Sequence, residues 1–375
     1  MKVLIAGDYS QENRVDSLVK TRKFDVLFDH IRPILSSVDY SIVNFEFPIV
    51  LEHGEPIQKS GPHLKGSIDS VQAVKYAGFN CCTLANNHIL DQGESCAKET
   101  KKALENGGLD TVGIGNNIDE ASQLLYKKID GKTLAVINCC EHEFSVASNT
   151  SYGANPLSPI NQYYSIIEAR QKADYVLVIV HGGHEHCELP SPRMQELYRF
   201  FVNIGADAVV NHHQHCFSGY EVYKGKPIIY GLGNLLFDWP DENNKPWNEG
   251  YMVELDFEDN GINIALYPYE QCNSTPGIFL MEGNKRKLFY EKIEQLNAII
   301  SDESLLNKEW RKWIEKNSKY FLLPFQPYKG RILKSLYIRG MLPSLISKKK
   351  KYGIINHIEC ESHLDRLKLM LKGCN

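Results

Sequence analysis

The feature that most constrains the fold is an alternation that runs through residues 1–240. Short apolar runs rich in valine and isoleucine alternate with longer stretches of helical periodicity. Such runs are typical of buried β-strands, and the stretches between them are typical of helices that cover a sheet. Seven strands are predicted on this basis: Lys2–Ala6, Tyr40–Phe45, Cys81–Leu84, Thr133–Asn138, Tyr175–Val180, Ala208–Asn211 and Pro227–Tyr230. We therefore expect an α/β protein with a mostly parallel or mixed sheet.

Helices and one hairpin are predicted between and after these strands. Residues 250–268 alternate apolar and polar side chains around an Asp259-Asn260-Gly261 turn, which indicates a β-hairpin. The predicted helices are Cys96–Glu105, Ser165–Lys172 and Met194–Ile204, the last followed by Gly205 as a C-terminal cap.

The character of the chain changes near residue 285. Beyond this point the pattern is helical, Trp310 and Trp313 are spaced to share a helix face, and basic residues gather toward the end. A chain of 375 residues can form one large α/β domain with an appendage. We expect residues 1–280 to form the α/β domain and residues 281–375 to form a helical, basic C-terminal region.

Composition excludes some classes of function. With 42 Lys and Arg against 46 Asp and Glu, the net charge of −4 does not indicate a nucleic-acid partner. The longest apolar runs have the length of strands, well short of the ~20 residues of a membrane-spanning helix. Because the N-terminal apolar run is also too short for a signal segment, we expect a cytoplasmic location. The ten cysteines include pairs inside apolar runs and show no zinc-knuckle spacing, so we expect buried thiols.

Polar side chains follow five of the predicted strands, at the point where each strand ends. In open α/β sheets, ligands bind at the carboxyl ends of the strands. The sequence therefore predicts a binding site at one sheet edge. Its candidate residues are Asp8, Asn44, Glu46, Asn86, Asn87, His88, His181, His212, His213 and His215.

Taken singly, these residues have structural explanations. Asp8 could cap the next segment, Asn86 and Asn87 could form a turn, and His181 could be a structural histidine. The histidine cluster that ends in His215 is harder to explain in this way, because an extended chain would place its alternate imidazoles on one side. Imidazole and carboxylate ligands suit zinc, iron or manganese. No nucleophile elbow or phosphate-binding glycine loop competes with this metal interpretation.

At these residues the chain resembles the CapA family of capsule synthesis and poly-γ-glutamate biosynthesis, a branch of the calcineurin-like metallophosphoesterase superfamily. The resemblance covers residues 1–240 and implies a metallophosphatase-like four-layer αββα sandwich, with the metal site at one edge and the helical C-terminal extension outside the match. Its motifs are Gly7-Asp8, Asn44-Phe45-Glu46, Ala85-Asn86-Asn87-His88 with Asp91 and Gly93, His181-Gly-Gly with Glu185, His213-Gln-His215, and Tyr230-Gly-Leu-Gly-Asn234.

The resemblance also implies roles for individual residues. Two divalent transition-metal ions, manganese, iron or zinc, would be held at the edge. Asp8 and His215 would hold the first ion, Asn87, His181 and His213 would hold the second, and Glu46 would bridge them. His88, oriented by Asp91, would be the general acid toward a leaving oxygen. The candidates for substrate contact are Asn44, Asn86, Glu185 and Asn234.

The sequence departs from the family pattern at four positions. Ser10 stands where many metallophosphoesterases have a histidine, and Glu46 replaces the usual bridging aspartate. The first metal site is therefore expected to be weak, or to fill only with substrate. Asn211 stands where the family usually has glycine and Gln214 where it often has proline, which leaves the ligands intact but alters the loop.

Three functions are compatible with these features. The first is a metal-dependent phosphoesterase-like hydrolase in capsule, exopolysaccharide or poly-γ-glutamate biosynthesis, acting on an anionic or phosphorylated glycan or polymer precursor. The second is a metal-containing protein that binds or assembles a polymer without hydrolysis. The third is a metal-dependent amide hydrolase or transferase on a γ-glutamyl polymer. The run Lys348–Lys351 is interpreted as a solvated loop or helix end, with peripheral contact to a membrane or a biosynthetic complex as the alternative.

Overall fold

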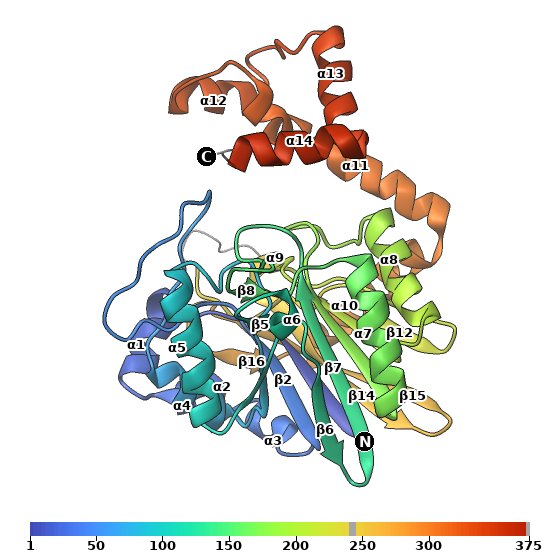
Figure 1. The fold of residues 1–375 in the computed structure, drawn as a ribbon. Coiled ribbons are helices and arrows are strands. Elements are labelled where there is room, and N and C mark those ends of the chain that lie inside the picture. Colours follow the sequence, from blue (N-terminus) through green and yellow to red (C-terminus); the bar gives the residue numbers. More distant parts are fainter. Residues whose placement is uncertain (240–244, 373–375) are drawn as a thin grey trace. The chain divides into compact units, whose positions relative to one another are not determined.

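The computed structural model describes residues 1–239 and 245–372, and the chain forms two compact units (Figure 1). The first unit comprises Met1–Asn307 and the second comprises Lys308–Asn375. The nine cysteines that lie in the described residues are free thiols, and eight of them are buried, as the sequence indicated.

The first sheet of the first unit has eight strands and a mixed direction. Strands β1 to β4 run parallel, whereas β14 to β16 pair in antiparallel fashion along one side of β1. β13 (Asn234–Leu236) pairs with the end of β1. In order across the sheet the other strands are β16 (Ile278–Leu280), β15 (Gly261–Gln271), β14 (Glu249–Glu258), β1 (Lys2–Tyr9), β2 (Tyr40–Phe45), β3 (Cys81–Thr83) and β4 (Asp110–Val112).

The second sheet has six strands, of which the central four are parallel. In order they are β11 (Tyr220–Tyr223), β12 (Lys226–Ile229), β10 (Ala208–His212), β9 (Tyr175–His181), β7 (Lys132–Cys140) and β6 (Leu125–Ile129). A short ribbon is formed by β5 (Ile114–Gly115) and β8 (Gly153–Ala154). All seven predicted strands are present, and they divide between two sheets.

The two sheets pack face to face, and helices cover their outer faces (Figure 1). Side chains of β1 and β2, such as Ile5 and Ile42, share a buried cluster with Val136 and Ile179 of the second sheet. The expected four-layer αββα sandwich is therefore confirmed. The first sheet is covered by α1 (Asn13–Lys20), α2 (Phe24–Phe28), α4 (Asp69–Ala77) and α5 (Gly93–Asn106), and the second by α7 (Pro159–Lys172) and α8 (Pro192–Asn203); α3 (Arg32–Leu35), α6 (Ile118–Ala121) and α9 (Lys245–Asn248) are short.

A further helix, α10 (Gly283–Ser301), belongs to the sandwich. Its side chains Phe289, Ile293 and Leu296 are buried in the cluster between the sheets, together with Phe217 and Tyr251. Burial of this apolar face explains why the compact unit extends to Asn307 and does not end at the expected residue 280.

The second unit is helical, as the sequence indicated. The rings of Trp310 and Trp313 stack with their centroids 5.3 Å apart, so they do share a helix face. None of the helices in the described part of the chain is long and apolar enough to cross a membrane. The elements are α11 (Glu303–Leu322), which begins in the first unit, a 3-10 turn (Leu323–Phe325), α12 (Arg331–Ile338), α13 (Lys348–Glu359) and α14 (Glu361–Lys372).

Candidate metal centre

The carboxyl ends of β1 and β2 in the first sheet meet those of β9 and β10 in the second. β1 and β2 pair in parallel, with Asp8 opposite Asn44, and β9 and β10 pair in parallel, with His181 opposite His212. Gly7 is required beside Asp8, because a Cβ there would lie 1.9 Å from the carbonyl oxygen of Gly233. The predicted strand-end residues are thus brought to one edge of the sandwich.

Glu46 is the most unusual side chain of this edge. It is 0% exposed, and neither carboxylate oxygen has a hydrogen-bond partner in the structure. Burial, with Asp8 as the largest neighbouring charge, raises the pKa of this carboxyl well above its usual range. A buried carboxylate without partners is strongly unfavourable unless a cation offsets it. Glu46 therefore fits a bound metal ion.

His181 faces Glu46 in a cluster of groups that hydrogen bonds alone cannot satisfy. Its Nε2 lies 3.4 Å from Glu46 Oε1, 3.0 Å from Asn87 Oδ1 and 3.1 Å from His213 Nδ1. One ring nitrogen offers either one proton or one lone pair, so it cannot pair with all three. Nitrogen and oxygen atoms that converge in this way could together bind a cation.

Two groups of donor atoms share Glu46. The donor atoms of Glu46, His181 and His213 lie within 4.8 Å of one another, and so do those of Asp8, Glu46 and His215. Burial lowers the pKa of His215 to about 3 and that of His181 well below its ordinary value. Both imidazoles are therefore neutral, which metal binding requires. The division of these donors between two ions, which the resemblance implies, stays a prediction.

Three of the four residues expected to contact substrate are instead buried behind the ligands. Asn44 donates to Asp8 Oδ1 at 2.7 Å, and Asn234 Oδ1 lies 2.8 Å from His215 Nδ1. Asn86 donates to the carbonyl oxygen of Phe45. These amides are at most 1% exposed, so their bonds orient ligands and turns and leave no face for a substrate.

Glu185, the fourth candidate, is exposed at the mouth of the site. One carboxylate oxygen of Glu185 and one ring nitrogen each of His213 and His215 lie within 4.8 Å of one another. These three side chains could therefore bind one metal ion together. Glu185 is therefore placed to meet either a metal ion or a substrate.

The loop after β10 is not extended, contrary to expectation. His213 and His215 adopt positive φ angles of 91° and 53°. The backbone N–H of His213 donates to Asp8 Oδ2 at 3.1 Å, which helps to hold the unusual conformation. The ring of His212 points elsewhere, with Nε2 2.9 Å from the carbonyl oxygen of Ala6.

His88 lies beside the ligand cluster and pairs with Asp91. Its Nδ1 is 2.6 Å from Asp91 Oδ2, so the expected orientation of the imidazole by Asp91 is present. Lys59, which sequence reasoning missed, forms an ion pair with Asp91 and places its amine 3.1 Å from His88 Nδ1. The Lys59 side chain is only 1% exposed, although it belongs to a loop without a recognisable motif.

Glu143 is a second residue that sequence reasoning missed. Its Oε2 accepts a hydrogen bond of 2.8 Å from the amide of Asn87, and its Oε1 lies 3.8 Å from His213 Nε2. The residue comes shortly after β7 ends at Cys140. The strand-end rule that identified the other candidates would therefore also have identified Glu143.

The residues that depart from the family pattern are accommodated in the core. Ser10 is 0% exposed and its hydroxyl has no hydrogen-bond partner in the described structure. Asn211 accepts a bond from Tyr198 and donates to the carbonyl of Gly182. Gln214 donates to the carbonyl of Cys187. Asn211 and Gln214 thus stabilise the histidine loop.

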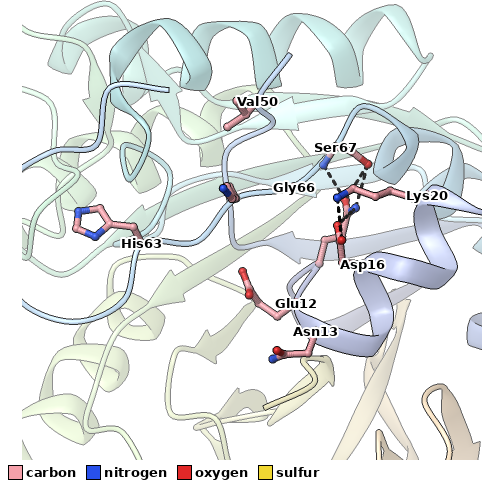
Figure 2. A pocket seen from close by; sticks show the side chains of 10 residues that line it. Glu12, Asn13, Asp16, Lys20, Val50, His63, Gly66 and Ser67 are labelled. Carbon is pink, nitrogen blue, oxygen red and sulfur yellow. Dashed lines mark hydrogen bonds and ion pairs between the residues drawn. The ribbon is translucent and has the colours of Figure 1, made fainter. Parts of the chain in front are cut away.

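A pocket of about 400 Å³ follows β1. Figure 2 shows side chains that line it, among them the acidic Glu12 and Asp16 and the basic Lys20. Burial raises the pKa of Glu12, in this pocket, to about 7. Asp91 is one of the charges that add to this shift, so the pocket lies within electrostatic reach of the His88–Asp91 pair. The charged or polar residues that line it include Glu12, Asp16, Lys20, His63 and Lys65.

Fold and site together define a class of protein: an αββα sandwich with a buried histidine and carboxylate cluster at one edge of its sheets. Residues 2–239 match the family described as bacterial capsule synthesis protein PGA_cap, and the chain belongs to this family.

Two curated relatives have names that refer to capsule or polymer synthesis. The chain is 33% identical over 272 residues to the capsule biosynthesis protein CapA of Bacillus anthracis, a match that covers 70% of this chain and 66% of the relative. It is 29% identical over 292 residues to the PGA biosynthesis protein CapA of Bacillus subtilis (strain 168), with 76% of each chain covered. The chain thus spans just under two thirds of the length of the first relative.

Solved structures with similar folds are more distant. A phosphatase from Mycoplasma pneumoniae is 14% identical, with a TM-score of 0.44, and the match covers 78% of this chain and 98% of that one. A 5'-nucleotidase precursor from Thermus thermophilus is 12% identical, with a TM-score of 0.45, and the match covers 80% and 59% of the two chains. These values describe a distant likeness in fold and carry no information on activity.

Proposed function

We propose that this protein is a metal-dependent hydrolase of phosphoester-type bonds that acts in capsule, exopolysaccharide or poly-γ-glutamate biosynthesis. The observation that carries the proposal is the buried carboxylate of Glu46, which lacks hydrogen-bond partners between two groups of histidine and carboxylate ligands. Membership of the capsule synthesis family supports the biological setting. The proposed substrate is an anionic or phosphorylated glycan or polymer precursor.

The residues that would hold two divalent ions follow from the two groups. Asp8 and His215 would hold one ion, Asn87, His181 and His213 the other, and Glu46 would serve both. Mixed nitrogen and oxygen ligands favour manganese, iron or zinc. Such ions supply Lewis-acid activation of water and neutralise charge on a phosphoryl group. The first site would be the weaker, because Ser10 offers no imidazole.

Charge at the mouth of the site explains why metal would be required for binding an anion. Glu143 and Glu185 are exposed there, and Asp8 and Glu46 lie behind them. Without cations, the negative charge of these acidic groups would repel a phosphate or a carboxylate polymer. The stronger site, at Asn87, His181 and His213, would therefore need its ion before an anionic substrate could bind.

The remaining chemical role belongs to His88. Asp91 accepts a hydrogen bond from His88 Nδ1, so in the doubly protonated imidazolium the proton on Nε2 is the one that would pass to the leaving oxygen. Lys59 offsets the charge of Asp91 and fixes its position. His88 would act as the general acid, and Asp91 and Lys59 would position it.

The test compares His88→Ala with Asn87→Ala. We expect His88→Ala to keep its metal and to lose roughly 10²–10⁴-fold in kcat on an alkyl phosphoester, the usual contribution of a general acid. The loss should shrink on p-nitrophenyl phosphate, whose leaving group needs little protonation. Asn87→Ala removes a ligand, so metal content and activity should fall together. The exposed His53, changed to Ala, is the matched control.

Two outcomes would contradict the assignment. If His88→Ala loses the metal, His88 is a ligand and not the acid. If the wild type retains metal but turns over no phosphoester, the polymer-binding function replaces the enzyme, and release of glutamate from a γ-glutamyl polymer would instead establish amide hydrolysis.

A further inference from the structure

The two units of the chain carry opposite charges. Residues 308–375 contain 16 Lys and Arg against 5 Asp and Glu, a net charge of +11. Residues 1–307 contain 26 Lys and Arg against 41 Asp and Glu, a net charge of −15. The overall charge of −4 hides this separation. A partner of the second unit is therefore expected to be anionic.

The positive charge of the second unit is concentrated in residues 316–358. This stretch contains ten Lys and Arg and no Asp or Glu. Its cations therefore cannot be neutralised within the stretch. They occur as separate groups on α11, around α12 and in the first turn of α13, where Lys348–Lys351 begin the helix.

The same stretch exposes many large apolar side chains. Among its described residues, eleven such side chains are exposed, including Ile332 at 75% and Met341 at 68%. Only Tyr337 and Ile346 are buried apolar residues in the described part of the second unit. So many exposed apolar side chains around so small a core indicate a contact site.

Hydrogen bonds give this surface a defined scaffold. Gln326 donates to Tyr337 Oη at 3.0 Å and to Ser344 Oγ at 2.9 Å, and it accepts from the backbone N–H of Leu345 at 2.9 Å. The segment after α12 is thereby tied to the turn before it. The exposed side chains are held by a folded unit.

Basic and apolar side chains alternate closely along the stretch. Ile332 and Leu333 lie between Arg331 and Lys334 on α12, and on α13 the lysine turn is followed by Tyr352, Ile355 and Ile358 at helical spacing. A soluble anionic polymer would use the charges but leave the apolar side chains in water. An anionic lipid surface accommodates both, because its headgroups attract Lys and Arg and its interface accepts apolar side chains.

We propose that residues 316–358 dock the second unit on the surface of an anionic lipid bilayer. The contact is peripheral, and it involves α12 and the segment that follows it as well as Lys348–Lys351. This inference is independent of the hydrolase proposal, because all proposed metal ligands lie in the first unit.

The test is co-sedimentation of the full chain with vesicles. One preparation contains phosphatidylcholine alone and the other contains phosphatidylcholine and phosphatidylglycerol in equal amounts. We expect binding to the anionic vesicles only, weakening as salt is raised. Changing Lys348, Lys349, Lys350 and Lys351 to Ser should weaken binding by at least about ten-fold. The control removes four exposed lysines of the first unit, Lys98, Lys172, Lys285 and Lys287, and should bind like wild type.

A second variant tests the apolar part of the contact. Ile332→Ser together with Met341→Ser changes two highly exposed side chains and no charge, so the fold should be retained. We expect this variant to bind the anionic vesicles more weakly than wild type. This difference should remain at high salt, where the contribution of the lysines is screened. Thermal unfolding followed by circular dichroism checks that each variant is folded.

Two results would overturn the proposal. If the wild type fails to sediment with anionic vesicles at low salt, another part of the protein or a protein partner covers the apolar surface. If the chain binds soluble polyglutamate and not the vesicles, the basic stretch is a polymer-binding site.

Discussion

Glu46 is the residue that most clearly marks the candidate metal centre. Its two carboxylate oxygens are buried without hydrogen bonds, whereas the neighbouring Asp8 accepts bonds from Asn44 and from the backbone of His213. Two carboxylates so close together have very different hydrogen bonding. Both carboxylate oxygens of Glu46 therefore remain available to bind a metal ion. The orientation of Asp8 is already fixed by its hydrogen bonds.

A residue-scale prediction concerns Glu12. Its pKa is raised from 4.5 to about 7 in the folded protein, mainly by burial. Its folded-state protonation thus stabilises the protein below pH 4.5, and this contribution is lost as the pH rises through about 7. Glu12→Gln removes this titration. The free energy of unfolding of the variant, relative to that of wild type, should therefore increase between about pH 5 and about pH 8. Urea unfolding of both proteins at the two pH values measures this change. The same difference in unfolding free energy at both pH values would refute the prediction.

The candidate site could be predicted to the extent that strand ends carry it. Asp8, His181 and His213 were found because a strand end is visible in sequence. Lys59 was not, because its loop position reveals nothing about its distance from Asp91. The positive φ of His215 was also missed, because tertiary contacts impose it on a residue that usually avoids this conformation.

At the scale of elements, α10 is the helix that most changes the expected organisation. It follows the last strand of the first sheet and closes the space between the sheets with Phe289 and Leu296. The sequence assigned it to the C-terminal region because its periodicity is helical. Periodicity shows that a helix has an apolar face, but it does not show which surface will cover that face.

An element-scale prediction follows for Phe289. The side chain is 4% exposed, and its ring centroid lies 5.1 Å from that of Phe217 and 5.6 Å from that of Tyr251. Phe289→Ala should lower the free energy of unfolding by about 3–5 kcal/mol, because a large buried ring leaves a cavity. The adjacent Leu288 is 54% exposed, and Leu288→Ala should change it by less than about 0.5 kcal/mol. Equal effects of the two variants in urea unfolding would show that α10 does not pack as described.

Helix starts were predicted less well than strands. α7 begins at Pro159 and α8 at Pro192, several residues and two residues before the expected starts. Ser158 and Ser191 cap these helices with their side chains, and a proline in the first turn follows each. The signal was therefore present in the sequence. The division of the strands between two sheets was not, because alternation does not identify a strand's neighbour.

At the scale of the whole molecule, the chain combines an acidic sandwich that contains the candidate metal centre with a basic helical unit. The boundary at Asn307 separates all candidate ligands from the basic stretch. Each unit can therefore be tested by removing the other.

Truncation tests this division. A chain that ends at Asn307 should remain soluble and bind metal like the full chain, because α10 is retained. A chain that ends at residue 280 should lose solubility, since removal of α10 exposes Phe217 and Tyr251. Solubility and metal content measure both. Insolubility of the longer form would show that the second unit is required for folding of the first.

The metal content of the full chain tests the proposed centre directly, when it is measured by elemental analysis after expression with added manganese, iron and zinc. We expect at least one equivalent of these ions in the wild type, rising toward two on titration, because the first of the paired sites would be the weaker. His213→Ala should hold less than wild type, because it removes a ligand next to Glu46 and His181. Less than one equivalent in the wild type, with no increase on titration with any of the three metals, would show that these residues do not form a metal centre.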